Sequence, residues 1–207
     1  MSYLTLLPLH LIPRPRSHHK DTPNNRHRDV MSIFPVELQG RARADAGILF
    51  RLERLPARPA AYLIRSNIRP HITNPDLAQQ VQILEEKFGW LEGGVIVNFR
   101  LSVNAVVREG ATRKTRPVPV QTGPAGGMGI DEWVAQKLAS ALDNVTVLNH
   151  NREVITEKQG GKTIQVDVVD GIAEIADPAL LESLMKKGVG RAKAYGCGLL
   201  TVKPAVP

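Results

Sequence analysis

Residues 144–177 place the turn sequence Gln159-Gly160-Gly161 between two stretches in which valine, isoleucine and threonine recur, and residues 163–168 alternate polar and apolar side chains. Alternation with a period of two is typical of β-strands that bury one face. Two such strands around a Gly-containing turn form a β-hairpin, and Lys158 and Lys162 flank this turn. The sequence therefore predicts a long antiparallel hairpin, which commits the fold to an antiparallel sheet.

Shorter elements precede and follow this hairpin. The apolar opening MSYLTLLPLHLI predicts a first strand, because it lacks the basic start and the cleavage site of a signal peptide. A helix is expected from a cap at Asp21 or Thr22, with Pro23 near its first position, to about Phe34. The stretch 75–88 fits either a helix or a strand. We further expect strands at 47–55, 59–67, 93–109, 113–122 and 198–204, and helices at 130–142, capped by Asp131, and at 178–188, ended by Gly188.

Strands interrupted by helices in this order come close to two β-α-β-β-α-β units, which is the ferredoxin-like arrangement. The predicted fold class is therefore α+β, with two tandem ferredoxin-like domains and antiparallel sheets. The Gly-rich stretch GWLEGG places the boundary near residue 90, which gives domains at 1–90 and 91–207. Only 4% of the residues are aromatic, so leucine, valine, isoleucine and alanine must form the cores.

The 27 lysines and arginines outnumber the 20 aspartates and glutamates, and the formal net charge is +7. A basic chain attracts phosphate polymers and acidic surfaces, although a merely soluble basic protein has the same composition. The single cysteine, Cys197, excludes an intramolecular disulfide, offers no thiolate cluster for zinc and fits a reducing cytoplasm. No apolar run approaches the roughly 20 residues of a membrane span, so no membrane partner is expected.

Residues 186–200, KKGVGRAKAYGCGLL, combine glycines with cations in a way that suggests a bound anion. Lys193 stands where the third glycine of a dinucleotide fingerprint would be, and the Walker sequence G-x-x-x-x-G-K-[ST] is absent. Successive backbone N–H groups in a Gly-rich loop can instead form a nest for phosphates. A helix end explains Gly188 but not the rest of the group, which comprises Gly190, Arg191, Lys193, Gly196 and Gly198.

The run GVGRAKAYGCGLLTVKP resembles the C-terminal signature of the CasE family, the repeat-RNA endoribonucleases of type I-E CRISPR systems. Further pieces resemble the family in the same order: HRDVMSIFP, ILFRLER, YLIRS, FRLSVNAV with TRPVPV, EWVAQKLA, and KTIQVDVVDGIAEIADPALLESLMKKG. The resemblance covers nearly the whole chain, and the Gly-rich run is its most specific part.

This resemblance implies two ferredoxin-like (RAMP) domains that bind the hairpin of a CRISPR repeat transcript and cut at its 3′ base. It implies a reaction without metal or other cofactor, which leaves a 2′,3′-cyclic phosphate and a 5′-hydroxyl. The protein would then stay on its RNA product as a cytoplasmic subunit of the Cascade complex, with the other type I-E subunits as partners.

Such a cleavage needs a base for the 2′-hydroxyl proton, an acid for the leaving 5′-oxygen and positive charge near the phosphate. Histidine suits either proton transfer because its ordinary pKa is about 6.5, and lysine and arginine suit the charge. The segment HHKDTPNNRHRD holds all three residue types. For His18 and His19 a solvated basic loop explains the sequence better than catalysis does.

His27 falls on the position of the family's catalytic histidine, four residues after Pro23 in a P-x-x-x-H-R run, and is the predicted catalytic residue. Family members often have a tyrosine three residues before that histidine, where this chain has Asn24. An amide forms hydrogen bonds but cannot donate a proton as a general acid. Lys20, His19 or a group positioned by the RNA are the alternatives for the second role, with Asn24 assisting only through hydrogen bonds.

Duplex RNA is recognised mainly through its shape, phosphates and 2′-hydroxyls, so cations and backbone N–H groups are the expected contacts. The resemblance assigns this role to the hairpin tip, with Arg152, Lys158 and Lys162, and to the Gly-rich loop. The predicted RNA-binding residues also include the cations beside His27 and in a second basic cluster: Arg26, Arg28, Arg113, Lys114 and Arg116.

Two other functions fit the sequence. Asn24, in place of the tyrosine, is consistent with a non-catalytic structural subunit that binds the crRNA hairpin. The basic composition alone fits a general RNA-associated protein, such as a ribosomal one. Tight binding of an uncut repeat would favour the first of these, and binding that ignores the identity of the hairpin would favour the second.

Overall fold

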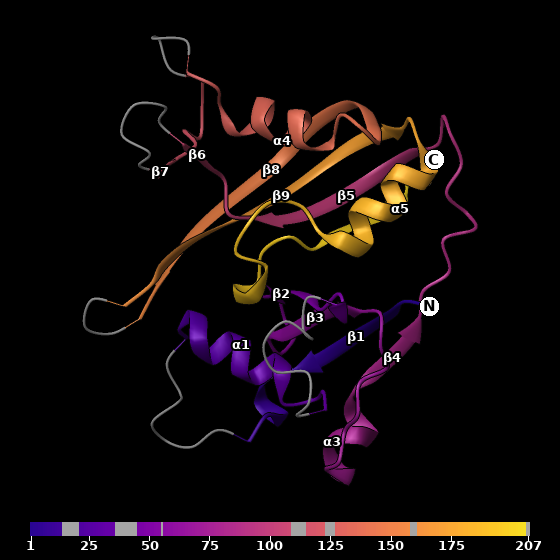
Figure 1. The fold of residues 1–207 in the computed structure, drawn as a ribbon, viewed down its shortest axis with the longest axis vertical. Helices are drawn as coiled ribbons and strands as arrows, with labels where there is room; N and C mark the ends of the chain where they lie inside the picture. Colours follow the sequence, from indigo (N-terminus) through magenta and orange to yellow (C-terminus); the bar gives the residue numbers. More distant parts are fainter. Residues whose placement is uncertain are drawn as a thin grey trace.

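The computed structural model describes residues 1–13, 21–35, 45–54, 56–108, 115–122, 127–157 and 161–205. Two four-stranded sheets organise these residues, one from each half of the chain. Figure 1 shows the first sheet, in indigo and purple, below the second, which is coloured magenta to yellow.

The first sheet consists of β1 (Tyr3–Pro8), β2 (Leu49–Glu53), β3 (Ala61–Ser66) and β4 (Gln82–Glu85). Its order is β2-β3-β1-β4, and every neighbouring pair is antiparallel. The turn η1 (Leu9–Leu11) follows β1, the helix α1 (Pro23–Met31) precedes β2, and the short helix α3 (Pro75–Gln80) precedes β4. The core of this half is mainly aliphatic and contains Leu7, Val30, Ile33, Ile48, Ile64, Phe50 and Tyr62.

The second sheet consists of β5 (Ile96–Val103), β8 (Leu142–Thr156), β9 (Thr163–Ile175) and β10 (Leu200–Pro204), in the order β10-β5-β9-β8. All its neighbouring pairs are antiparallel. The helices α4 (Ile130–Leu138) and α5 (Pro178–Lys187) bury their apolar residues in the same core as β5 and β9. A small hairpin of β6 (Val106–Arg108) and β7 (Thr115–Pro117) follows β5, and the turn η4 (Lys193–Tyr195) lies between α5 and β10.

Both halves share one topology. In each sheet the first and third strands of that half are central, and its second and fourth strands lie at the edges. With a helix after the first strand and another before the fourth, this is the ferredoxin-like arrangement. The predicted α+β class, with tandem ferredoxin-like units and antiparallel sheets, is confirmed. The strands of the two sheets span residues 3–85 and 96–204, while the domain limits 1–90 and 91–207 stay a prediction.

The predicted hairpin over 144–177 is confirmed as the pair β8 and β9, although Gln159 and Gly160 of its turn lie outside the described residues. The stretch 75–88, for which a helix and a strand were both open, contains one after the other: the short helix α3 and then the strand β4. Asn74 is the N-cap of α3. Its side chain accepts hydrogen bonds from the backbone N–H groups of Asp76 and Leu77.

Two local predictions are wrong. The expected strand over 93–109 breaks after Val103, because Asn104 donates its side-chain amide to the Gln165 carbonyl at 2.8 Å and Ala105 N–H donates to Asp167 at 3.2 Å. These bonds turn the chain away from the sheet and into β6. Asp131 does not cap α4, since Gly129 is the N-cap and Asp131 lies in the first turn, where its charge still favours the helix N-terminus.

Two buried arginines of the first sheet bind the second half. Arg65, on β3, pairs with both oxygens of Glu86 and donates to the carbonyls of Met185 and Leu200 at 2.9 and 2.6 Å. Arg51, on β2, donates to the carbonyl of Arg100 at 3.1 Å and to the hydroxyl of Thr201 at 2.9 Å. Charged donors to buried carbonyls fix both distance and direction, so these contacts set how the halves meet.

No helix in the described residues is long and apolar enough to cross a membrane.

Candidate active site

The helix α1 carries His27 and begins as the sequence predicts. Thr22 is its N-cap, with its hydroxyl accepting a hydrogen bond from Asn25 N–H at 3.3 Å, and Pro23 fills the first helical position. His27 lies on the second turn of this helix and is partly buried, while Asn24 and Arg28 are exposed. The predicted catalytic histidine therefore sits on a regular, capped element rather than on a loop.

Arg26, next to His27, is enclosed by carboxylates. Only 1% of its side chain is exposed, and its guanidinium binds Asp21 at 2.6 and 2.8 Å and Glu153, on β8, at 2.7 Å. Burial alone would lower the pKa of Arg26, but the bonds to Asp21 and Glu153 outweigh burial and raise it. Arg26 therefore uses these donors inside the protein and joins α1 to β8, while its predicted RNA contact stays a prediction.

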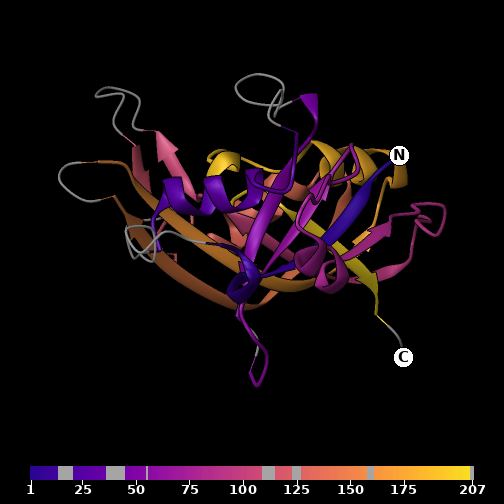
Figure 2. The same cartoon turned by 90° about the horizontal axis from the view of Figure 1, so that it is seen from below.

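Glu157 makes a second link between α1 and the hairpin. Its carboxylate accepts a hydrogen bond from Asn24 N–H at 2.9 Å, in the first turn of α1. A negative charge at this end of a helix is favourable because the first backbone N–H groups have no partner within the helix. Figure 2, seen from below, shows the orange β8–β9 ribbon extending alongside α1.

The Gly-rich loop packs on β2 and is held by its own hydrogen bonds. Gly188 ends α5 with a φ of 75°, and a Cβ there would lie 2.7 Å from Leu49, so only glycine fits this close approach. Gly196 is buried against Phe50, and its carbonyl accepts the hydroxyl of Ser102 at 2.6 Å. These contacts turn the loop toward the first sheet.

The structure gives the predicted residues of this loop different environments. Gly196 and Gly198 are buried, which argues against both as direct RNA contacts, while Gly188 is partly buried as the end of α5. Gly190 and Arg191 are exposed. Lys193 is partly buried and its ammonium donates to the Lys187 carbonyl at 2.6 Å, closing the loop on itself.

The cations of the hairpin also differ from one another. Arg152 is partly buried, and it donates to Asp167 at 2.6 Å and to the Val118 carbonyl at 2.7 Å, so it braces the hairpin internally, while its RNA contact stays a prediction. Lys162, immediately before β9, is exposed and donates to the hydroxyl of Tyr195 at 2.7 Å. Arg116 is exposed on β7. Five other predicted residues lie outside the described part: His19, Lys20, Lys158, Arg113 and Lys114.

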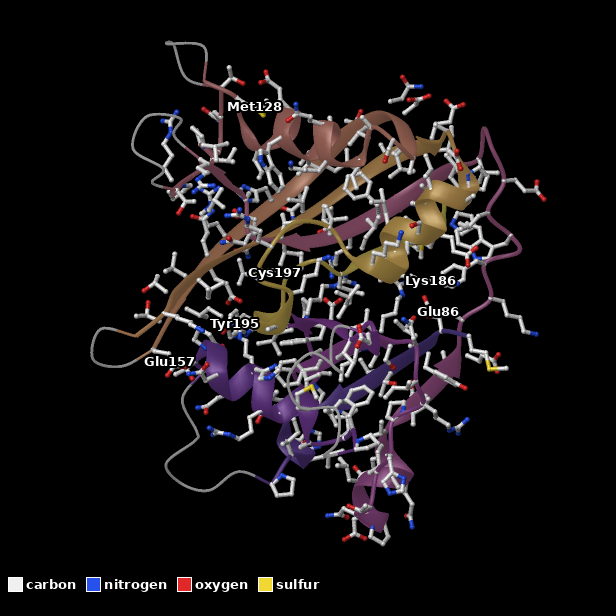
Figure 3. All side chains as sticks on the ribbon, viewed as in Figure 1. Glu86, Met128, Glu157, Lys186, Tyr195 and Cys197 are labelled. Atoms are coloured by element: carbon white, nitrogen blue, oxygen red, sulfur yellow. The ribbon has the colours of Figure 1, made fainter. Side chains whose placement is uncertain are left out.

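Three segments that are distant in the sequence thus meet around α1. The turn η4 contacts both α1 and β2, and the hairpin reaches α1 through Glu157 and η4 through Lys162. Figure 3 shows Tyr195 above α1 and Glu157 beside the N-terminal end of this helix. Sequence reasoning missed Tyr195 and Glu157. Tyr195 stood within the Gly-rich signature, but no pattern in the sequence marked Glu157.

The environment of Cys197 and the grouping of metal-binding side chains bear on cysteine and metal catalysis. Cys197 is buried in the structure, and burial, together with nearby Asp167, raises the pKa of its thiol above the ordinary value. A thiol held in this form is a poor nucleophile. Among the residues that the structure describes, no three His, Cys, Asp or Glu side chains are grouped so that they could hold a metal ion.

Comparison with known proteins places this site in a family. A family model described as CRISPR associated protein matches residues 2–204. The chain belongs to the CRISPR-associated protein family.

Individual relatives of this CRISPR-associated protein agree with that assignment. The CRISPR-associated endoribonuclease Cse3 of Thermus thermophilus is 30% identical over 230 residues, which cover 96% of this chain and 99% of the relative. The Cascade subunit CasE of Escherichia coli is 30% identical over 74 residues, or 35% of this chain and 37% of the relative. The predicted resemblance to the CasE family is confirmed.

Solved structures share the fold. Thermus thermophilus Cse3 bound to an RNA representing a pre-cleavage complex has a TM-score of 0.72 at 24% identity, covering 98% of this chain and 99% of that one. Cas6e from Escherichia coli has a TM-score of 0.63 at 21% identity, covering 99% of this chain and all of that one. The ferredoxin-like arrangement is therefore found over the full length of both structures.

Proposed function

We propose that this CRISPR-associated protein is an endoribonuclease that binds the hairpin of a CRISPR repeat transcript and cuts pre-crRNA into crRNA. The observation that carries the proposal is the meeting of the His27 helix with the basic Gly-rich loop and the hairpin. The name of the Thermus relative, an endoribonuclease, supports the same activity.

The proposed reaction is an attack of the 2′-oxygen on the adjacent phosphorus, which breaks the bond to the 5′-oxygen and leaves a 2′,3′-cyclic phosphate and a 5′-hydroxyl. His27 exchanges one of the two protons, because a histidine can accept or donate a proton near neutral pH. Cations beside the phosphate stabilise the charge of the transition state, so that no metal ion is required.

Exposed cations around this surface supply the proposed RNA contacts. Arg28 on α1, Arg191 in the Gly-rich loop and Lys162 on the hairpin are exposed on three segments that meet. Arg116, exposed on β7, is a further proposed contact. Phosphate contacts of this kind position a nucleic acid without reading its bases. We propose that the protein then stays on the crRNA as a Cascade subunit in the cytoplasm, where Cys197 stays reduced.

Cleavage of the cognate repeat RNA under single-turnover conditions tests this function. We expect His27→Ala to slow cleavage by about 100-fold or more, as loss of a general acid or base does, and His10→Ala, an exposed histidine on η1, to cleave normally. A 2′-deoxy substitution at the scissile nucleotide should abolish cleavage, and EDTA should not affect the wild-type rate. Equal rates for wild type and His27→Ala would remove His27 from the mechanism, and EDTA-sensitive cleavage would contradict the metal-free reaction.

A non-catalytic crRNA-binding subunit is the second candidate function. Asn24 favours it, because the exposed amide beside His27 on α1 cannot supply a proton. The same assay separates the two functions: tight binding of a repeat that stays uncut at long times would establish the scaffold and exclude the nuclease.

A further inference from the structure

Tyr195 lies where the three segments of the site meet. It ends the turn η4, which contacts the His27 helix, and its phenol oxygen accepts a hydrogen bond from Lys162 at 2.7 Å. The same ammonium lies 5.2 Å from the centroid of the tyrosine ring. This second distance follows from the hydrogen bond, because the phenol oxygen lies between the ring and the ammonium, so the oxygen is the atom that Lys162 holds.

The backbone around Tyr195 is held on both sides. Ala192 and Gly196 flank the turn in the left-handed region, with φ of 57° and 94°, and Tyr195 N–H donates to the Ala192 carbonyl at 2.9 Å. Gly196 is buried, and its carbonyl is bound by Ser102. Tyr195 itself is partly exposed, on a turn that contacts α1, and its hydroxyl is bound by Lys162 from the hairpin. A reacting group needs this kind of support to keep its position.

The Lys162 contact gives this phenol a chemical role. Because its oxygen accepts a hydrogen bond from the ammonium, the O–H group of Tyr195 remains available to donate its own proton. When the proton leaves, the ammonium stabilises the negative charge that forms on the oxygen. The hydrogen bond to Tyr195 and the charge interaction with it raise the pKa of Lys162, so that this lysine stays cationic.

Two carboxylates and an amide near α1 do not offer the same chemistry. The Glu157 carboxylate accepts a hydrogen bond from the backbone of α1, and Glu153 pairs with Arg26 and Arg54. The side chain of Asn24 has no acidic proton. His27 provides one proton transfer, while the cleavage reaction needs a second group for the other.

We propose that Tyr195 is the general acid of the RNA cleavage, an inference that rests on the proposed function. His27 takes the proton of the 2′-hydroxyl as the oxygen bonds to phosphorus. The bond from phosphorus to the 5′-oxygen breaks, its electron pair leaves with that oxygen, and Tyr195 gives the oxygen a proton. The tyrosinate, stabilised by Lys162, regains a proton from water, and the imidazolium releases its proton to water.

The variant Tyr195→Phe tests this role because it removes the acidic proton and keeps the ring. On repeat RNA we expect single-turnover cleavage to fall by about 100-fold or more, with the Kd for RNA within about 2-fold of wild type. The unchanged Kd also shows that the variant is folded. Tyr3→Phe, the same substitution on β1, is the matched control and should cleave at the wild-type rate.

A second substrate, with sulfur in place of the bridging 5′-oxygen at the scissile phosphate, distinguishes acid catalysis from a structural role. A thiolate leaves without being protonated, so Tyr195→Phe should cleave this RNA within a few-fold of wild type. His27→Ala should stay slow on it, because the 2′-hydroxyl still needs a base.

Three results would overturn the assignment. If Tyr195→Phe cleaved normal RNA at the wild-type rate, the phenol hydroxyl would not be required. An equal loss on the oxygen and sulfur substrates would show that Tyr195 only positions other groups. A wild-type protein that binds the repeat but cuts neither substrate would overturn the proposed nuclease itself, and the inference with it.

Discussion

Arg26 and His27 are neighbours in the sequence and have different environments in the fold. One step along an α-helix rotates the side chain by about 100°. The guanidinium of Arg26 is therefore buried between Asp21 and Glu153, while His27 is partly exposed. The sequence predicts the same role for Arg26 and Arg28, because composition does not say which cation meets a carboxylate from β8.

The burial of Arg26 predicts a large loss of stability for Arg26→Ala. Removing a buried, paired charge costs about 2–4 kcal/mol, since its two carboxylate partners lose their shared cation. Urea unfolding of Arg26→Ala and of Arg28→Ala, its exposed neighbour, measures this, and the second variant should lie within about 0.5 kcal/mol of wild type. Weaker RNA binding by Arg26→Ala without loss of stability would show that Arg26 contacts RNA after all.

Cys197 should be unreactive in the folded protein. It is buried, and its raised pKa keeps the thiol protonated, whereas alkylating reagents react with the thiolate. We expect iodoacetamide at pH 8 to label native protein on the order of 100-fold more slowly than protein in urea. Equal labelling rates would mean that the segment around Cys197 opens readily.

At the scale of elements, the hairpin β8–β9 does more than extend the second sheet. It crosses to the first half, where Glu153 and Glu157 bind residues of α1 at 2.7 and 2.9 Å. The network continues through Arg54, which pairs with both Glu153 and Asp21. The element expected to grip RNA is therefore attached directly to the helix that carries the candidate catalytic histidine.

Substitutions of Glu157 test how much this attachment contributes to the stability of the protein. Glu157→Ala removes both the charge and the hydrogen bond at the N-terminus of α1 and should lower the free energy of unfolding by about 1 kcal/mol. Glu157→Gln keeps an acceptor oxygen, so it should lose about half as much. Thermal unfolding of the two variants gives the comparison, and equal losses would show that only the charge matters.

The elements themselves could largely be predicted because their signals are local. The Gly-containing turn indicated the β8–β9 hairpin, Pro23 and Thr22 marked the start of α1, and Gly188 marked the end of α5. The break after Val103 could not be predicted, because the partner of Ala105 is Asp167, which is 62 residues away. For the same reason the site was predicted only in part: His27 lies in a recognisable run, but Tyr195 acquires its role from Lys162 on another element.

At the scale of the whole molecule, arginine–carboxylate pairs link elements that lie far apart in the sequence. Burial alone would raise the pKa of Asp170, but hydrogen bonding and charge from Arg100 outweigh it and lower the pKa. For Asp21, burial is likewise outweighed by Arg26 and Arg54. Glu53 connects this set to the first sheet, since it binds both Arg51 and Arg100.

These lowered pKa values predict acid sensitivity. A carboxyl group whose pKa is lower in the folded protein than in the unfolded chain contributes stability above its unfolded pKa of about 3.9, and this stability is lost as the pH falls through the folded pKa. The free energy of unfolding should therefore decline between about pH 5 and pH 2. Asp170→Asn removes one such group and should make the decline shallower. An identical pH dependence in this variant would exclude Asp170 as a contributor.

The contact between Arg65 and Leu200 has a consequence for how the protein is made. The two residues are 135 positions apart, so the acceptor of this guanidinium does not yet exist when the first sheet leaves the ribosome. Until α5 and β10 are synthesised and docked, Arg65 must stay hydrated or pair with Glu86 alone. The nascent N-terminal half thus carries an incomplete surface, and the junction that holds α1, η4 and the hairpin together is assembled only late in synthesis.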